Sequence, residues 1–214
     1  MKIAIVTFDG FNEIDSLVAA HILNRVPKPG WKAEIAAPAP SVTSMNGVVI
    51  AAQRPLEFLE DAEAVIFGSG RKTQQAIEDS SLMAKIKIAP DRQLVASQCS
   101  GALFLARLGL LRDMPACTDV RTRPELEAAG VEVIEAPFYA RGNIASAGGC
   151  LSAQYLATWI IWRLIGKDAA IEALSYVVPV GQQEEYISRA IRAVAEYIIA
   201  PAIMVCAPGT ERRV

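Results

Sequence analysis

Residues 93–106 read Gln93-Leu94-Val95-Ala96-Ser97-Gln98-Cys99-Ser100-Gly101-Ala102-Leu103-Phe104-Leu105-Ala106. In this stretch an apolar run of strand type passes into an apolar run of helix type with almost nothing between them, and Cys99 stands at the junction. Small residues lie two positions before the cysteine, at Ser97, and two positions after it, at Gly101. This spacing is typical of a nucleophile elbow, a sharp strand-to-helix turn that displays one reactive side chain.

The elbow predicts how Cys99 is placed and charged. A strand that turns directly into a helix strains the backbone at the corner residue, and small neighbours let the two elements approach each other. The corner side chain then projects above the carboxyl ends of the strands, where open α/β sheets bind ligands. We expect the N-terminus of the following helix to favour a thiolate at Cys99. The backbone N–H of Ser100 is placed to stabilise developing negative charge.

Outward from the elbow, strand-type runs alternate with helical patterns along the chain. The predicted strands cover residues 2–8, 31–36, 64–67, 93–97, 131–135 and 143–146, with a hairpin over 42–51 that turns at Asn46-Gly47. The predicted helices cover residues 11–26, 73–89, 101–108, 122–130, 151–165, 167–174 and 184–200. This alternation predicts an α/β fold, with a mostly parallel sheet and helices on both of its faces.

Composition bounds the classes of protein that fit. The chain has 214 residues, of which 52% are hydrophobic, and its 21 basic and 23 acidic residues give a net charge of -2. A near-balanced charge excludes the basic stripe that nucleic-acid binding favours, and no basic amphipathic helix indicates a membrane partner. We expect a single domain over residues 1–207 and a flexible tail over 208–214.

Targeting signals are not evident. The first residues lack a signal-peptide pattern, and the longest apolar stretch, residues 151–165, is shorter than the roughly 20 residues of a membrane span. We therefore expect a cytoplasmic location. The cysteines, which would be reduced there, are widely spaced: Cys99, Cys117, Cys150 and Cys206. With one histidine in the chain, a metal site has too few of the usual ligands and is not expected. No other cofactor is predicted.

Cys117, Cys150 and Cys206 are interpreted as structural thiols, because free cysteine is among the most buried residue types. Cys150 is the second candidate for lining the site, since it follows Gly148-Gly149 and opens an apolar helix. His21 lies inside the first predicted helix among apolar residues and is expected to be packed or to face a dimer partner. A Cys-His-Asp triad is therefore not predicted.

Carboxylates are the alternative partners for the thiol. Glu13 and Asp15 lie where the first strand gives way to the first helix, at the same sheet edge as Cys99. Ile14 and Leu17 are expected to face the core, which leaves both acids on flanking positions, and the sequence does not decide which is nearer the sulfur. Asp15 is the better candidate for burial, where its carboxyl would be protonated and would act as a general acid.

Four segments in order carry a family resemblance. They are Ile5-Val6-Thr7-Phe8-Asp9-Gly10-Phe11-Asn12-Glu13-Ile14-Asp15, Val65-Ile66-Phe67-Gly68-Ser69-Gly70, Ala96-Ser97-Gln98-Cys99-Ser100-Gly101-Ala102 and Asn143-Ile144-Ala145-Ser146-Ala147-Gly148-Gly149. Over residues 2–166 the chain resembles the DJ-1/PfpI (ThiJ/PfpI) superfamily, whose folds are like those of class I glutamine amidotransferases. The spacing up to Asp15 is most similar to the isocyanide hydratase and amidase-like branch.

The resemblance implies a flavodoxin-like three-layer sandwich and a homodimer with the cysteine near its interface. It implies that Cys99 is catalytic with a nearby acid whose position Asp15 matches; Glu13, which the residues alone also offer, is the other candidate catalytic acid. It also implies that Gly70 supplies a second N–H of an oxyanion-type pocket beside Ser100, and that Gly68 and Thr118 contribute to substrate binding. Two motifs of that branch are replaced here, one of them by Thr118-Asp119-Val120. No histidine follows Cys99, so peptidase activity is the activity least expected.

Three functions are compatible with the sequence. The first is a small-molecule enzyme in which Cys99 attacks an electrophilic carbon of an isocyanide, amide or 2-oxoaldehyde, and water then releases an amide or acid. The second is a redox or ligand sensor in which oxidation of Cys99 is the signal and no substrate is turned over. The third is a stable α/β dimer whose site has decayed.

Overall fold

The computed structural model describes residues 1–198 of the chain. The strands are β1 Lys2–Val6, β2 Lys32–Ala37, β3 Ser41–Thr43, β4 Val49–Ala51, β5 Arg54–Pro55, β6 Ala64–Phe67, β7 Leu94–Gln98, β8 Phe138–Arg141 and β9 Ile144–Ala147. The α-helices are α1 Glu13–Leu23, α2 Thr73–Glu78, α3 Ser80–Lys85, α4 Ala102–Arg107, α5 Arg123–Ala128, α6 Ala153–Leu164, α7 Lys167–Ser175 and α8 Gln183–Ala195. Short 3₁₀ helices are η1 Leu56–Asp61, η2 Cys99–Gly101 and η3 Cys150–Ser152.

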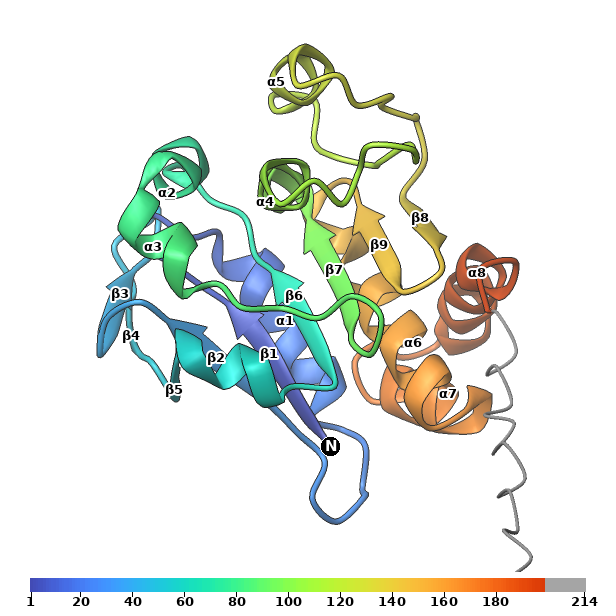
Figure 1. The fold of residues 1–214 in the computed structure, drawn as a ribbon. Helices are drawn as coiled ribbons and strands as arrows, with labels where there is room; N and C mark the ends of the chain where they lie inside the picture. The colour runs from blue at the N-terminus through green and yellow to red at the C-terminus, as the bar shows by residue number, and fades with distance from the viewer. Residues whose placement is uncertain (199–214) are drawn as a thin grey trace, which may run out of the picture.

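A single seven-stranded sheet, in the order β5-β2-β1-β6-β7-β9-β8, forms the centre of the fold (Figure 1). All its strand pairs are parallel except β8 and β9, which pair as an antiparallel edge. The chain leaves β1 toward β2 on one side and returns to β6 on the other. The carboxyl ends of β1, β6 and β7 therefore meet at the point where open α/β sheets bind ligands.

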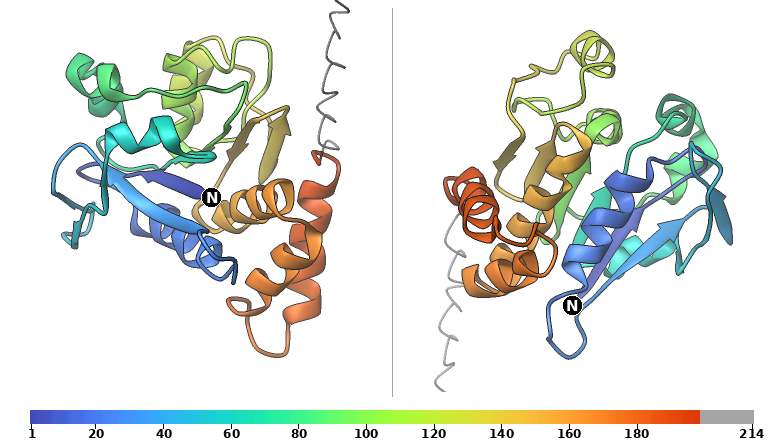
Figure 2. Two further views of the ribbon diagram at one scale, coloured as in Figure 1. Left: turned by 60° about the horizontal axis from the view of Figure 1, so that its bottom comes forward. Right: turned by 180° about the vertical axis from the view of Figure 1, so that it is seen from behind.

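Helices cover both faces of the sheet (Figure 2). Ile3 and Ile5 of β1 pack in one cluster with α1, α6, α7 and α8. Ala4 and Val6, which alternate with them, pack in a second cluster with η1 and α2 to α5. Strands buried on both faces read as continuous apolar runs, as β1, β6 and β7 do. The predicted flavodoxin-like α/β sandwich is confirmed.

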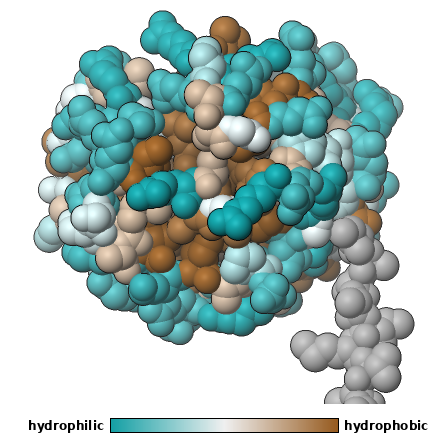
Figure 3. All heavy atoms as spheres, turned by 45° about the horizontal axis from the view of Figure 1, so that its top comes forward, coloured by the Kyte–Doolittle hydropathy of each residue, from teal (hydrophilic) through white to brown (hydrophobic). Residues whose placement is uncertain are grey.

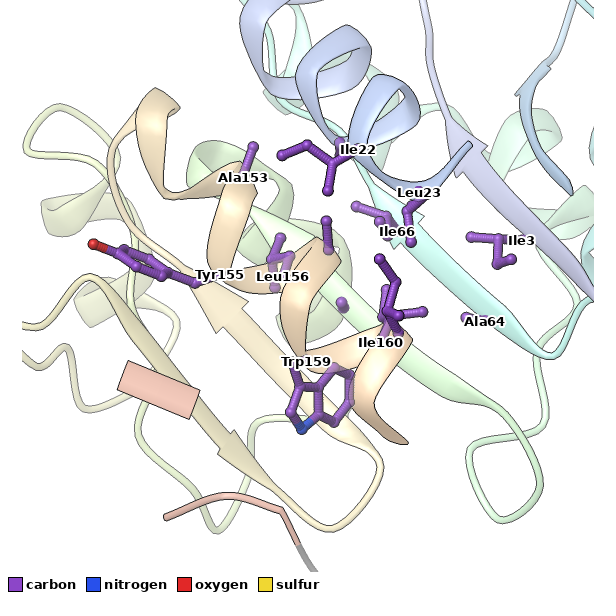
Figure 4. Close-up of a cluster of buried hydrophobic side chains, with 14 of the residues drawn as sticks. Ile3, Ile22, Leu23, Ala64, Ile66, Ala153, Tyr155, Leu156, Trp159 and Ile160 are labelled. Atoms are coloured by element: carbon purple, nitrogen blue, oxygen red, sulfur yellow. The ribbon is translucent and has the colours of Figure 1, made fainter. Parts of the chain in front are cut away.

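The larger helical layer joins the two halves of the sheet through apolar contacts. Figure 4 shows Ile22 and Leu23 of α1 and Ile160 of α6 gathered over Ile3 and Ile66 of the strands. All five of these side chains are at most 1% exposed. Burying a side chain of this size contributes about 1.5–3 kcal/mol, so this layer fixes α1 relative to the strands and with it the residues that precede the helix.

One predicted helix is broken. The pattern over residues 73–89 predicts a single helix, whereas the structure has two short ones, α2 and α3, separated at Asp79. The Asp79 carboxylate accepts hydrogen bonds from the backbone N–H groups of Ser81 and Leu82 at 2.8 Å and 3.1 Å. An aspartate that caps a new helix in this way ends the previous one.

The strand predicted over residues 131–135 is absent, and β8 was not predicted. The Ala116 N–H donates to the Glu132 carbonyl at 2.9 Å, and the Ile134 N–H donates to the Ala116 carbonyl at 3.1 Å. These backbone groups therefore pair with a loop and not with the sheet. The edge position goes instead to β8, which turns into β9 at Gly142, where φ is 61°.

The buried face of α1 also differs from the prediction. Ile14 and Leu17 are 44% and 37% exposed, so the expectation that they face the core is wrong. The buried residues of α1 nearest its start are instead Asp15 and Ser16. The Ser16 Oγ is the nearest atom, at 2.7 Å, to the Cβ that any residue other than glycine would place at position 68. Close packing on the strand end therefore selects small and polar side chains on this face.

The structure does not describe residues 199–214, so the end of the predicted helix over 184–200, the predicted tail and Cys206 lie outside the described residues. Within residues 1–198, no helix combines the length and the apolar character needed to cross a membrane.

Candidate active site

The predicted elbow is present at the end of β7. Cys99 has φ of 47°, and among the described residues it is the one non-glycine residue with positive φ. A Cβ added at Gly101 would lie well inside contact distance of the Phe67 carbonyl oxygen. Only glycine therefore lets the helix approach β6 this closely, and the strained corner residue presents its sulfur at the carboxyl edge of the sheet.

Three side chains from distant parts of the sequence meet at this edge. One carboxylate oxygen of Asp15 and the sulfur atoms of Cys99 and Cys150 all lie within 4.8 Å of one another. Asp15 is fully buried; its Oδ2 accepts a hydrogen bond from the Ser69 hydroxyl, and its Oδ1 has no oxygen or nitrogen partner. The buried acid is therefore an immediate neighbour of both sulfurs.

The surroundings of Asp15 and Cys99 oppose negative charge on both groups at once. Burial raises the pKa of the Asp15 carboxyl above its usual value. Burial also raises the pKa of the Cys99 thiol, and the neighbouring Asp15 charge raises it further. The expectation of a resting thiolate favoured by the helix N-terminus is therefore wrong, because desolvation and a nearby carboxylate both favour the neutral thiol. A proton on Asp15 removes one of the charges that raise the pKa of the Cys99 thiol.

A cavity of about 480 Å³ opens above these groups. Cys99 is 3% exposed, yet its side chain lines this cavity. Other lining residues with polar or charged side chains are Asn12, Ser69, Arg71, Thr73, Gln74, Ser100, Asp119, Arg121, Thr122 and Glu125. With the top of the molecule tilted forward, hydrophobic residues gather at the middle of the face and hydrophilic residues surround them (Figure 3). The volume suits a small molecule and not a folded polypeptide.

The two residues predicted for an oxyanion-type pocket lie at the cavity and contact each other. The Gly70 N–H donates to the Ser100 Oγ at 3.2 Å and to the Thr73 Oγ1 at 3.1 Å. The two hydroxyls are themselves 2.8 Å apart. The Gly70 N–H is therefore engaged in this structure, and it becomes available to a substrate only when the Ser100 and Thr73 hydroxyls both turn away.

Glu13 is not brought to the sulfur. Its carboxylate accepts hydrogen bonds from the Ser44 hydroxyl and, at 3.0 Å, from the Asn46 side chain, both on the hairpin between β3 and β4. The hydrogen bond from Ser44 is the main reason that its pKa is lowered. Asn12 caps α1 by accepting from the Ile14 N–H at 3.1 Å, so Glu13 begins the helix on the side that faces the hairpin. Of the two candidate acids, the structure places only Asp15 at the site.

Gly68 and Thr118 are next to the elbow but do not line the cavity. The Thr118 hydroxyl donates to the Cys99 carbonyl oxygen at 2.9 Å, which positions the corner backbone. Gly68 packs against Ser16 of α1. His21 is an exposed residue of α1 whose ring lies 5.9 Å from that of Tyr176, and it does not line the cavity either.

Cys150 is the site residue that the sequence interpretation undervalued. It is partly buried, and the Asn12 side-chain amide donates to its sulfur at 3.2 Å. The Gln98 amide donates to the Gly149 carbonyl at 2.7 Å, which ties the segment before Cys150 to the residue before Cys99. The only signal in the sequence was the Gly148-Gly149 pair. This pair follows a predicted strand, so Cys150 comes just after a strand end, and Cys99 does the same.

The two sulfurs are ligands that soft cations prefer, whereas the carboxylate suits harder cations. Within residues 1–198, no further histidine, cysteine or acid joins Asp15, Cys99 and Cys150 at this distance, and a structural zinc site takes four ligands. The absence of a metal cofactor stays a prediction.

Comparisons with known proteins agree with this fold. A family model described as the DJ-1/PfpI family matches residues 1–162. A deglycase of Thermococcus kodakarensis is 24% identical over 150 residues, which is 68% of this chain and 89% of that protein.

Among solved structures, a THiJ/PfpI family protein from Pseudomonas syringae has a TM-score of 0.74 at 23% identity, covering 92% of this chain and 87% of that one. Oxidized DJ-1 from Toxoplasma gondii has a TM-score of 0.71 at 19% identity, covering 84% of this chain and 98% of that one. At these identities the two structures show a shared fold.

Proposed function

This chain belongs to the DJ-1/PfpI family, and from that premise we propose that it is a cysteine-dependent enzyme acting on a small electrophilic molecule. The reaction is a hydratase-like or hydrolase-like addition at carbon, with an isocyanide, an amide or a 2-oxoaldehyde as substrate. One observation carries the proposal: a fully buried carboxyl, Asp15, shares a site with the sulfur of Cys99 at the edge of a cavity of about 480 Å³.

The Asp15 carboxylate is placed to move a proton between the thiol and the substrate. Burial raises the pKa of both groups, so each binds a proton more readily than the free side chain does. Attack by Cys99 forms a carbon–sulfur bond as the thiol proton passes to Asp15. The protonated Asp15 then gives that proton to the substrate atom that gains electron density.

The adduct differs with substrate and its release needs water. An isocyanide gives a thioimidate and a 2-oxoaldehyde gives a hemithioacetal. The N–H of Ser100, and that of Gly70 when its hydroxyl partners turn away, stabilise the charge that develops. Water hydrolyses the thioimidate to an N-substituted formamide and frees the thiol. The hemithioacetal must first isomerise, by transfer of the aldehyde hydrogen to the neighbouring carbonyl carbon, to the thioester of a 2-hydroxy acid, which water hydrolyses to the acid. An amide loses its amine to form a thioester, which water hydrolyses in the same way. The related deglycase supports a carbonyl-directed reaction of this kind, whereas the position of Asp15 supports the isocyanide hydratase-like one.

A substrate panel tests the proposal. The purified chain is incubated with isocyanides, 2-oxoaldehydes and small amides, product formation is followed by NMR, and adducts are sought on the tryptic peptide 93–107, which carries Cys99. We expect turnover of at least one class and an adduct on that peptide alone. Absence of both turnover and adduct over the whole panel would contradict an enzyme and favour a redox sensor.

The second candidate is therefore a redox sensor without turnover. It is supported by one structural relative, the DJ-1 of Toxoplasma gondii, whose solved structure is that of the oxidized protein. It is also supported by the position of Cys99 in a cavity that a small oxidant can enter. Oxidation of Cys99 would change the charge beside the buried Asp15 and with it the stability of the site. Oxidation of Cys99 by peroxide without any turnover is the outcome that distinguishes this candidate.

We also propose the homodimer that the family resemblance implies. Apolar side chains are exposed beside the site, among them Ile14 and Leu17 of α1 and Leu151, which is 74% exposed. A second copy covering this patch would remove it from water, as dimer interfaces do. We expect sedimentation analysis to give twice the 23.0 kDa chain mass, and a double variant, Ile14→Glu with Leu17→Glu, to give the monomer.

The matched control for this experiment is Val49→Glu, which adds a charge at an apolar residue that is 65% exposed on the hairpin. This variant should keep the dimer mass. A wild-type chain that sediments as a monomer at all concentrations would contradict the dimer.

A further inference from the structure

The proposed enzyme reaction leaves one reactive group of the site unused. The sulfur of Cys150 lies within 4.8 Å of the sulfur of Cys99, and it borders the same cavity. The side-chain amide of Asn12 donates a hydrogen bond to the Cys150 sulfur at 3.2 Å. A partly accessible thiol this close to a displayed nucleophile is positioned to react with whatever forms on that nucleophile.

We propose that Cys150 is a resolving thiol, which captures a sulfenic acid formed on Cys99 by a hydroperoxide and converts the pair into a reversible disulfide. This modification site is separate from the proposed enzyme reaction and does not rest on its substrate. It also differs from a sensor that stops at sulfinate, because the disulfide is restored by thiols whereas sulfinate is not.

The geometry requires only a small movement. A disulfide has an S–S length of about 2.05 Å, so the two sulfurs must approach by less than about 3 Å. Cys99 is fixed by the strained elbow and by the hydrogen bond from Thr118 to its carbonyl. Gly149 has φ of 85°, and no atom beyond Gly149 and its chain neighbours lies within 4 Å of where its Cβ would be. We therefore expect Cys150, and not Cys99, to move when the two sulfurs approach each other.

The chemistry balances with one hydroperoxide. The Cys99 sulfur attacks the outer peroxide oxygen, a sulfur–oxygen bond forms, the oxygen–oxygen bond breaks, and the alcohol leaves with the thiol proton. The Cys150 sulfur then attacks the Cys99 sulfur, a disulfide forms, and the hydroxyl leaves as water with the proton of Cys150. Two thiols are oxidised and one peroxide is reduced, and exchange with an external dithiol restores the site.

Asp15 serves both steps because its carboxylate lies within 4.8 Å of both sulfurs. Its Oδ1, fully buried and without an oxygen or nitrogen partner, is available to take the proton of either thiol. The second thiol acts within the same molecule, at an effective concentration of about millimolar or more. At micromolar peroxide, capture by Cys150 therefore precedes a second oxidation to sulfinate.

Peptide mapping of the full chain tests the proposal directly. Trypsin places each of the four cysteines in a peptide of its own, 93–107, 113–121, 142–163 and 193–212. The chain is treated with one equivalent of tert-butyl hydroperoxide and then digested without reductant. The digest should contain peptides 93–107 and 142–163 joined by a disulfide, and dithiothreitol should separate them. Sulfinate on an unlinked Cys99, or a link to either other peptide instead, would overturn the proposal.

A pair of variants gives the quantitative test. In Cys150→Ser, peroxide should drive Cys99 to sulfinate, so that the fraction of Cys99 thiol recovered by dithiothreitol falls at least about fivefold below wild type. Cys117→Ser, a control at a buried cysteine outside the cavity, should recover as wild type does. Equal recovery in Cys150→Ser and wild type would refute the role of Cys150. If Cys150→Ser does not fold, the wild-type cross-link alone decides.

These outcomes are independent of the proposed enzyme activity. The cross-link is read by mass and needs no turnover, so a chain that turns over a substrate without forming the disulfide refutes only this inference. A chain that forms the disulfide without turning over any substrate refutes only the proposed function.

Discussion

Replacing Cys99 with alanine is expected to lower kcat/KM for the substrate found in the panel by about 10³-fold or more. The variant loses the only group that the proposed reaction uses to form a covalent adduct, and a water molecule in its place has no comparable nucleophilicity. The measurement compares initial rates of wild type and Cys99→Ala on the same substrate.

Cys117→Ala is the control for this comparison, since Cys117 is a buried cysteine that does not line the cavity. It should keep wild-type activity, and circular dichroism should show that both variants are folded. Turnover by Cys99→Ala within tenfold of wild type would show that the sulfur is not the nucleophile.

The second large effect is expected at the buried acid. Asp15→Asn keeps the shape of the side chain but cannot take or give the proton, and turnover should fall by about 10²–10³-fold. The same substitution removes the carboxylate that raises the pKa of the Cys99 thiol. Alkylation of Cys99 by iodoacetamide should therefore reach its midpoint at a lower pH, by roughly one unit.

Opposite changes in the two rates distinguish proton transfer from general damage to the site. We expect Asp15→Asn to alkylate faster than wild type at neutral pH while it turns over substrate more slowly. If both rates fall together, the acid has only a structural role, and the proposed proton transfer is contradicted.

The pH dependence of the melting temperature of Asp15→Asn, compared with wild type, shows whether the pKa of Asp15 is raised or lowered in the folded protein. Because burial raises the pKa of Asp15, the folded state binds this proton more tightly than the unfolded state does. The corresponding stabilisation is present below the unfolded pKa and is lost as the pH rises through the folded one. The asparagine variant has no such loss, so its melting temperature relative to wild type should be higher at pH 8 than at pH 4.

Local patterns were sufficient for the architecture and for the elbow at Cys99. The apolar runs of β1, β6 and β7 have the period and length of buried strands, and the small residues around Cys99 permit one sharp turn and little else. These features depend on neighbours in the sequence. Helix breaks and edge strands were less predictable, because Asp79 and the β8 pairing depend on competition between alternative hydrogen bonds.

Only the tertiary structure decided which groups share the site. The choice between Glu13 and Asp15 depends on how α1 is oriented on the sheet, because residues two positions apart lie about 160° apart around a helix and only one of them can face the sulfur. Cys150 reaches the cavity because β9 pairs with β7, so that two strand ends far apart in the sequence meet at one edge. The raised pKa of the Cys99 thiol follows from its burial and from the nearby carboxylate, two features that the sequence around the helix terminus does not contain.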